Sequence, residues 1–170
     1  MLQFQTSPYL ELSKNWPESG RHILAQYDDE AIIVYQAYRP EIGEYAVAHQ
    51  RFGGAFKFTR MSWIKPNFLW MMYRAGWASK PGQEMILAVT IPRSLFDEIL
   101  VQAIPSTFTT ALFPDRETWQ QAVAASDCDC SGTLITVPSE LLSKGVRCNW
   151  ACGEKCSGDM PQMRFWRLRM

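Results

Sequence analysis

The chain has 170 residues, of which 47% are hydrophobic and 20% charged, and its formal net charge at pH 7 is zero. This composition is typical of a globular protein of one domain, and the zero net charge gives no sign of nucleic acid or an acidic membrane as partner. No apolar run approaches the roughly 20 residues of a membrane-spanning helix, and the N-terminal stretch lacks the pattern of a secretory signal. We therefore expect a cytoplasmic protein without a membrane partner.

The first half of the chain predicts two strands and two helices after a polar lead-in. An apolar, β-branched stretch predicts a buried strand at 31–38. The proline that follows favours a helix over 40–52, and two glycines would end it. The alternating stretch 55–62 predicts a second strand, and another proline favours a helix over 66–75.

The second half continues the alternation of strands and helices. A clear strand is predicted at 84–91, a helix at 92–103 and a short strand at 106–113. A further helix is predicted at 115–126, with Asp115 as its N-cap. This order predicts an α+β single domain, a mixed or antiparallel sheet with flanking helices.

Several residues that often carry chemistry stand in patterns that do not support a site. His22 and His49 have no serine or cysteine at the spacing of a nucleophile, so a catalytic triad is not indicated. The acidic stretch 28–30 precedes a strand and predicts a solvated turn rather than a metal site. The cysteines follow a C-x-C and a C-x3-C-x3-C spacing that departs from the paired zinc knuckle, so we expect no metal. They are Cys128, Cys130, Cys148, Cys152 and Cys156.

The stretch 58–77, FTRMSWIKPNFLWMMYRAGW, combines aromatic rings with cations. Its cations are Arg60, Lys65 and Arg74, and Trp63 lies between the first two. Buried cations need a charged partner or a ligand, and guanidinium groups beside aromatic rings suit a ligand with a planar ring and a phosphate. A nucleotide has both, whereas packing of these rings in the core is the simpler alternative.

Two long segments resemble a known family. They are YDDEAIIVYQAYRPEIGEYAV and FTRMSWIKPNFLWMMYRAGWASKPGQEMILAVTI, and the words RMSWIKPNFLWMMYR and GWASKPGQE are the most specific. From about residue 21 to residue 126 the chain resembles the family called domain of unknown function 4291. That family has no established activity, so the resemblance implies no reaction.

The order of elements is also similar to the ADP-ribosyltransferase-like fold. In that fold a His or Arg on the first strand and a Ser or Tyr after the next strand hold NAD, and a Glu on a later strand assists transfer of ADP-ribose. The similarity places Gln36 and Ser62 at the first two of these positions, as candidate catalytic residues. Glutamine can bond a ribose but carries no charge, so the usual catalysis does not follow.

These observations favour a nucleotide-binding protein, with NAD as a possible cofactor and ADP-ribosyl transfer as a possible reaction. Arg60 and Lys65 would meet phosphate, and Tyr35 or Trp63 would stack on a ring, with Arg74 nearby. The alternative is a non-catalytic module that binds protein or nucleic acid, such as a nucleic-acid end, through the aromatic and basic 60–77 face.

The segment from Asp127 onward departs from the family's pattern. The family continues there with strands like V-R-V-Q-W-D-P and R-S-I-Q-I-G-L-R-G, whereas this chain has DCDCSGTLIT. A single shift of reading frame permits L-R-L-Q-W-D-P-D-H from Asp127 and V-Q-L-G-L-R-G further on. We therefore divide the chain into a family-like α+β domain at 1–126 and an out-of-frame, poorly ordered tail at 127–170, which would leave the C-terminal part of the fold incomplete.

Overall fold

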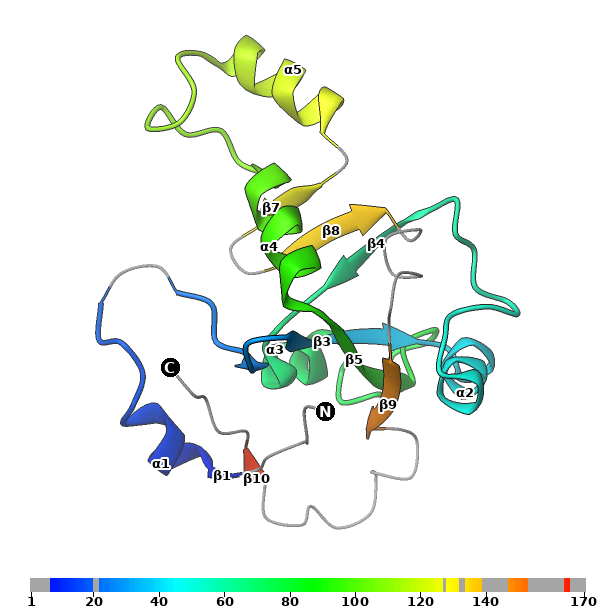
Figure 1. The fold of residues 1–170 in the computed structure, drawn as a ribbon. Helices are drawn as coiled ribbons and strands as arrows, with labels where there is room; N and C mark the ends of the chain where they lie inside the picture. The colour runs from blue at the N-terminus through cyan, green and yellow to red at the C-terminus, as the bar shows by residue number, and fades with distance from the viewer. Residues whose placement is uncertain are drawn as a thin grey trace.

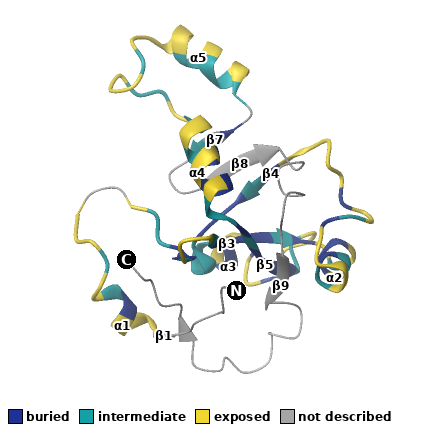
Figure 2. Ribbon diagram, in the orientation of Figure 1, coloured by how far each residue is buried: buried dark blue, intermediate teal, exposed yellow. Residues whose placement is uncertain are grey.

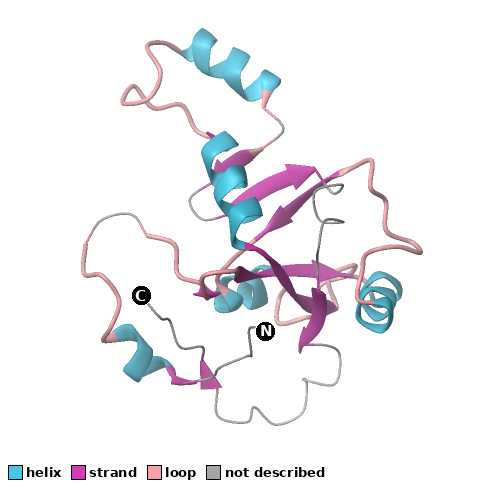
Figure 3. Cartoon of the chain, viewed as in Figure 1, coloured by secondary structure: helices cyan, strands magenta, loops and turns pink. Residues whose placement is uncertain are grey.

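The computed structural model describes residues 7–19, 22–126, 128–131, 134–138, 147–152 and 164–165. The fold is α+β (Figure 1; Figure 3). Its elements, in chain order, are β1 (Ser7–Pro8), α1 (Tyr9–Ser13), β2 (Gln26–Tyr27), β3 (Ala31–Tyr38), α2 (Pro40–His49), β4 (Met61–Ile64), α3 (Phe68–Arg74), β5 (Met85–Pro92), α4 (Arg93–Gln102), β6 (Ile104–Pro105), α5 (Arg116–Ala125), β7 (Asp129–Ser131), β8 (Leu134–Pro138), β9 (Arg147–Cys152) and β10 (Arg164–Phe165).

The central sheet has the strand order β2-β3-β5-β9, and all its strand pairs are antiparallel. Its longest pairing joins β3 to β5, in a register that runs from Ala31 opposite Pro92 to Tyr38 opposite Met85. Both strands are apolar and rich in β-branched residues, which suits strands that are covered on both faces.

A second sheet has the strand order β4-β8-β7-β6, with β6 parallel to β7 and the other pairs antiparallel. The expected α+β single domain is thereby confirmed, but its strands form more than the one mixed or antiparallel sheet that the sequence predicts. A short two-stranded sheet joins β1 to β10. The two larger sheets meet where Tyr35 and Lys65 exchange backbone hydrogen bonds of 2.7 and 3.1 Å.

Side chains of β3 alternate between two apolar clusters on opposite faces of the central sheet. Val34 and Tyr38 belong to one cluster, which includes the inner faces of α2 and α4. Ile33 and Tyr35 belong to the other, which includes Met71 of α3. Figure 2 shows both central strands as buried, in agreement with a sheet placed between helices.

Most predicted elements occur within two residues of their expected limits. The strand at 31–38 has the expected bounds, and Asp115 caps α5 by accepting the Thr118 N–H at 2.7 Å, as predicted. The strand predicted at 55–62 coincides with β4 only at residues 61–62, and the strand predicted at 106–113 is wrong. Residues 55–60 form turns before β4, and residues 106–113 form turns after β6.

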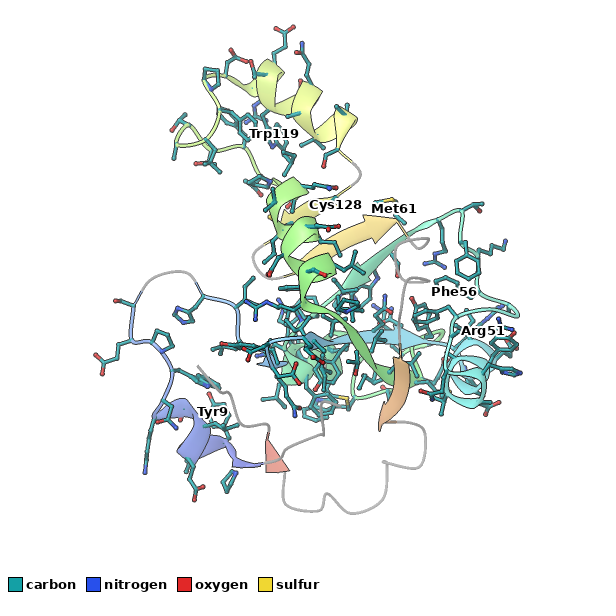
Figure 4. The ribbon with its side chains drawn as sticks, viewed as in Figure 1. Tyr9, Arg51, Phe56, Met61, Trp119 and Cys128 are labelled. Carbon is teal, nitrogen blue, oxygen red and sulfur yellow. The ribbon has the colours of Figure 1, made fainter. Side chains whose placement is uncertain are left out.

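Aromatic packing explains both differences from the predicted strands. Phe56 stacks on Phe52 at 4.5 Å, while its N–H closes a turn onto Gly53. The ring of Phe108 has its centre 6.2 Å from that of Trp119. Trp119 belongs to α5 and is labelled in Figure 4. Aromatic residues of a loop can alternate with polar residues in the sequence, as the buried residues of a strand do. The alternation therefore does not distinguish a loop from a strand.

Candidate functional site

The main candidate site is a cavity of about 370 Å³ between the end of β3 and the start of β4. We call it the Gln36 pocket. Its walls are residues of these two strands, of the first turn of α2, of the 55–60 loop and of the turn before β5. The described lining residues are Gln36, Ala37, Tyr38, Arg39, Ile42, Ala55, Phe56, Lys57, Arg60, Ser62, Trp63, Gly82 and Gln83.

Three buried side chains form a hydrogen-bonded cluster on one wall of the pocket. The amide nitrogen of Gln36 donates to Ser62 Oγ and to the carbonyl oxygen of Trp63, both at 3.1 Å. The hydroxyl of Tyr38 lies 3.0 Å from the same Ser62 Oγ. Gln36, Tyr38 and Ser62 are all buried, so these bonds form out of bulk water, where they are stronger.

This cluster exists because β3 and β4 separate beyond the Tyr35–Lys65 bridge. Within a ladder, backbone groups would bond one another across the strands. Here the side chain of Gln36 reaches the backbone of Trp63 instead, and Ser62 and Tyr38 point into the same gap. Because β3 and β4 separate here, polar side chains of both strands line a pocket between them.

The mouth of the Gln36 pocket is cationic. Arg39, Lys57 and Arg60 are exposed lining residues, and no described lining residue is acidic. Arg39 is paired with Glu41 at 2.8 Å, while Arg60 Nε donates to the Met61 carbonyl at 3.3 Å. A concave site with this charge attracts anions.

The remaining predicted site residues lie on the opposite face of the sheet. The ring of Tyr35 packs 5.2 Å from that of Phe68, and the Lys65 ammonium lies 4.3 Å from the Trp70 ring. The Trp63 ring packs on the apolar cluster that contains Tyr35. These side chains form what we call the Lys65 cluster. On the side of the Gln36 pocket, the carbonyl oxygen of Trp63 accepts from Gln36.

Arg74 also belongs to the Lys65 cluster, because its guanidinium lies 5.9 Å from the Trp63 ring. Burial lowers the pKa of the Lys65 ammonium and raises the pKa of the Tyr35 phenol, since an apolar environment disfavours each charged form. A smaller cavity of about 60 Å³ reaches Tyr35 from the side of α1.

The structure thus brings together only part of the predicted site. Gln36, Ser62 and Arg60 line the Gln36 pocket, whereas Tyr35 and Lys65 lie across the sheet from it. The division follows from the strand period of two, which sends neighbouring residues to opposite faces.

Sequence reasoning missed Tyr38, Lys57 and Gln83 as pocket residues. Tyr38 could have been found, because it is two positions after Gln36 on the same strand and so shares its face. Lys57 and Gln83 lie in turns, where no periodicity indicates the direction of a side chain.

The acidic stretch 28–30 and His49, the other residue types that often carry chemistry, make contacts that belong to local structure. Asp28 accepts the N–H groups of Glu30 and Ala31 at 3.0 and 2.8 Å, so the acidic stretch is an exposed turn, as predicted. His49 is exposed and stacks on Tyr45 at 4.0 Å. Among the described residues, no group of three or more possible ligands could hold a metal ion.

The cysteine-containing segment contributes backbone to both larger sheets. β9 pairs with β5, and β8 pairs with β4. Cys128 is buried and Cys130 is partly buried, while the side chains of Cys148, Cys152 and Cys156 lie outside the described residues. Within the described part of the chain, no helix is long and apolar enough to cross a membrane.

Comparison with known proteins supports the family and nothing more specific. No curated protein and no solved structure matched the chain, so similarity to the ADP-ribosyltransferase-like fold stays a prediction. One family model matches residues 22–159, a range that begins close to the expected residue 21 and continues past Ser126 through β9. The chain therefore belongs to the family described as Domain of unknown function (DUF4291).

Proposed function

We propose that the chain binds a nucleotide in the Gln36 pocket, with its phosphates at the mouth and its sugar against Gln36 and Ser62. The observation that carries this proposal is the combination of a buried polar wall with a cationic mouth. Phosphate suits Arg60 and Lys57, because guanidinium and ammonium groups bond its oxygens with charge assistance.

The size of the pocket supports a ligand of this kind. Small-molecule sites enclose roughly 300–1,000 Å³, and the Gln36 pocket of about 370 Å³ is at the lower end of that range. A nucleoside fills such a volume, and the attached phosphates then extend to the exposed rim. Phe56 is a buried lining residue whose ring offers an apolar surface to the bound ligand.

NAD is the first ligand to test, because Gln36 and Ser62 would correspond to residues that hold NAD if the expected similarity to the ADP-ribosyltransferase-like fold is correct. In this proposal Gln36 and Ser62 hold a ribose in a fixed orientation, and Tyr38 fixes Ser62 in turn. Transfer of ADP-ribose is a separate step, and release of nicotinamide from NAD in the presence of the protein measures it.

The binding proposal is tested by calorimetric titration of NAD, ADP-ribose and ADP. The double variant Lys57→Ala/Arg60→Ala should weaken ADP-ribose binding at least tenfold and reduce its dependence on salt concentration. Lys14→Ala is the matched control, since Lys14 is also exposed and follows the last residue of α1, outside the pocket lining. Absence of binding for all three ligands would refute the proposal.

A second candidate function is binding of a nucleic acid through the outer side of α3. Tyr73 is 78% exposed and Trp77 is 47% exposed, and the exposed Arg74 lies beside Tyr73 in sequence. Exposed rings beside a cation form a stacking platform for unpaired bases. Tyr73→Ala/Trp77→Ala should then weaken binding of single-stranded RNA and leave ADP-ribose binding unchanged, whereas Lys57→Ala/Arg60→Ala should affect ADP-ribose more strongly.

A further inference from the structure

Two lining residues of the Gln36 pocket each carry a buried amide oxygen that no donor from the described residues reaches. They are Oε1 of Gln36 and Oε1 of Gln83, which both belong to lining residues. Buried acceptors of this kind are rare in folded proteins, because each has lost its bond to water without replacement. Two of them in the lining of one pocket indicate that hydrogen-bond donors come from a ligand.

The orientation of the Gln36 amide is determined by its neighbours. The carbonyl oxygen of Trp63 can only accept, so the group that faces it at 3.1 Å must be the amide nitrogen. The Gln36 side chain is 1% exposed and belongs to the central strand β3. Its Oε1 is therefore a fixed acceptor, which cannot exchange places with the nitrogen without loss of the hydrogen bond to the Trp63 carbonyl.

Gln83 is held by a tight turn at the start of β5. Its N–H donates to the Lys80 carbonyl at 2.9 Å, and the N–H of Gly82 donates to Glu84 Oε1 at 2.8 Å. Gly82 has φ +77°, a conformation that favours glycine, and no atom lies within 4 Å of the position of a Cβ there. The turn thus places Gln83 in the pocket lining and leaves open space at the neighbouring Gly82.

We propose that the buried end of the ligand carries at least two hydrogen-bond donors, which bond Gln36 Oε1 and Gln83 Oε1. This inference rests on the proposed function and names its ligand class: a phosphorylated molecule whose phosphate meets Arg60 and Lys57 and whose opposite end is a donor. The vicinal hydroxyls of a ribose and the amino group of a base both have this chemistry. Gln83 then favours phosphorylated ligands that have a hydrogen-bond donor at the buried end.

The test uses Gln83→Met, which removes the acceptor and keeps the length and volume of the side chain. Gln36→Met is less suitable, because it also removes the bonds to Ser62 and Trp63 and so destabilises the fold. Gln120→Met, at an exposed position of α5, is the matched control. The thermal unfolding midpoint of each variant is measured first, and Gln83→Met should not lower it, because the substitution removes a buried acceptor that has no partner.

The proposal predicts that Gln83→Met weakens ADP-ribose binding about three- to tenfold, the effect of one lost hydrogen bond. Inorganic pyrophosphate, which has no donor-bearing end, should bind the variant and the wild type equally. Ribose 5-phosphate and 2′,3′-dideoxyadenosine 5′-diphosphate distinguish the two donor sources, since the first has hydroxyls without a base and the second has a base without the diol. If Gln83→Met weakens binding of ribose 5-phosphate, the donors are the ribose hydroxyls. If it weakens binding of the dideoxy nucleotide, the donor is the amino group of the base.

The outcomes separate the two proposals. If the wild-type protein binds none of these molecules, nucleotide binding itself is wrong and this inference fails with it. If ADP-ribose binds the wild type and Gln83→Met with equal affinity, nucleotide binding stands and the assignment of a donor-bearing end is wrong.

Discussion

The hydroxyl oxygen of Ser62 lies 3.0 Å from the phenolic oxygen of Tyr38, and both side chains are buried in the wall of the Gln36 pocket. Ser62 comes from β4 and Tyr38 from the end of β3, so this contact joins the two larger sheets at the place where their strands separate. The same serine oxygen accepts the amide N–H of Gln36. One hydroxyl thus holds two residues of the proposed ribose site.

Removal of either hydroxyl should destabilise the fold, and the two losses should not add. We expect Tyr38→Phe and Ser62→Ala each to lower the free energy of unfolding by about 1 kcal/mol, because each breaks a buried hydrogen bond. The double variant should lose less than the sum, by about 0.5–1.5 kcal/mol, since the second change removes a bond that is already broken. Urea denaturation of the four proteins measures this coupling, and strictly additive losses would show that the contact contributes nothing.

A methyl group at Gly43 should destabilise the packing of α2 on the central sheet. Replacement of a helical glycine by alanine ordinarily stabilises a helix by roughly 0.5–1 kcal/mol. Here a Cβ would lie 2.5 Å from Cε and 2.8 Å from Sδ of Met85, which is buried in β5. We expect Gly43→Ala to lower the free energy of unfolding by about 1–2 kcal/mol, as overpacked cores do.

A compensating substitution tests whether the Met85 side chain causes this loss. Met85→Ala removes the two closest atoms, at the cost of a cavity of its own. The double variant Gly43→Ala/Met85→Ala should therefore be more stable than the sum of the two single losses predicts. A Gly43→Ala variant as stable as the wild type would mean that the methionine moves aside without strain.

The sequence predicts the central strands well because their burial is uniform. Both faces of β3 and β5 are covered, so a continuous apolar stretch leads to the correct bounds for β3. The aromatic turns at 55–60 resemble a strand for a local reason, since the ring of Phe56 is buried against Phe52 without any strand partner. The periodicity of apolar residues in the sequence indicates which side chains are buried. A buried side chain can belong to a strand or to a turn, so the periodicity alone does not determine the backbone conformation.

The candidate site was predictable only in part, because the face of each residue depends on register. Tyr35 and Gln36 were expected to hold one ligand together, yet adjacent positions in a strand face opposite sides. Lys65 follows β4 and lies on the face of Tyr35, while Ser62 lies on the face of Gln36. The pairing of β3 with the end of β4 joins residues 30 positions apart (65 − 35), and no local pattern indicates it.

The out-of-frame origin of residues from Asp127 onward is tested by the nucleotide sequence of the gene. The expected result is that a shift of one reading frame near codon 127 encodes L-R-L-Q-W-D-P and later L-G-L-R-G. A protein made from the shifted frame should then resist urea better than this chain. Shifted frames that lack these two segments would contradict the hypothesis and leave the cysteines as residues native to the chain.

Burial of Lys65 should make the stability of this protein depend on pH above neutrality. The pKa of the Lys65 ammonium is lowered from its ordinary value of 10.5 by desolvation. Between the folded and the unfolded pKa the unfolded chain binds more protons, so the free energy of unfolding rises with pH in that window. Below the folded pKa both states are protonated, and the full cost of burying the charge is present.

Lys65→Met should flatten this rise, because a thioether has no proton to release. The measurement is urea denaturation of both proteins from pH 7 to 9.5, with the difference between them plotted against pH so that other titrating groups cancel. The upper limit avoids Tyr35, whose pKa is raised from 10.0 by burial and whose effect on stability therefore has the opposite sign at higher pH. Lys57→Met is the matched control, since Lys57 is exposed and should keep the wild-type slope. Equal slopes for the wild type and Lys65→Met would contradict this prediction.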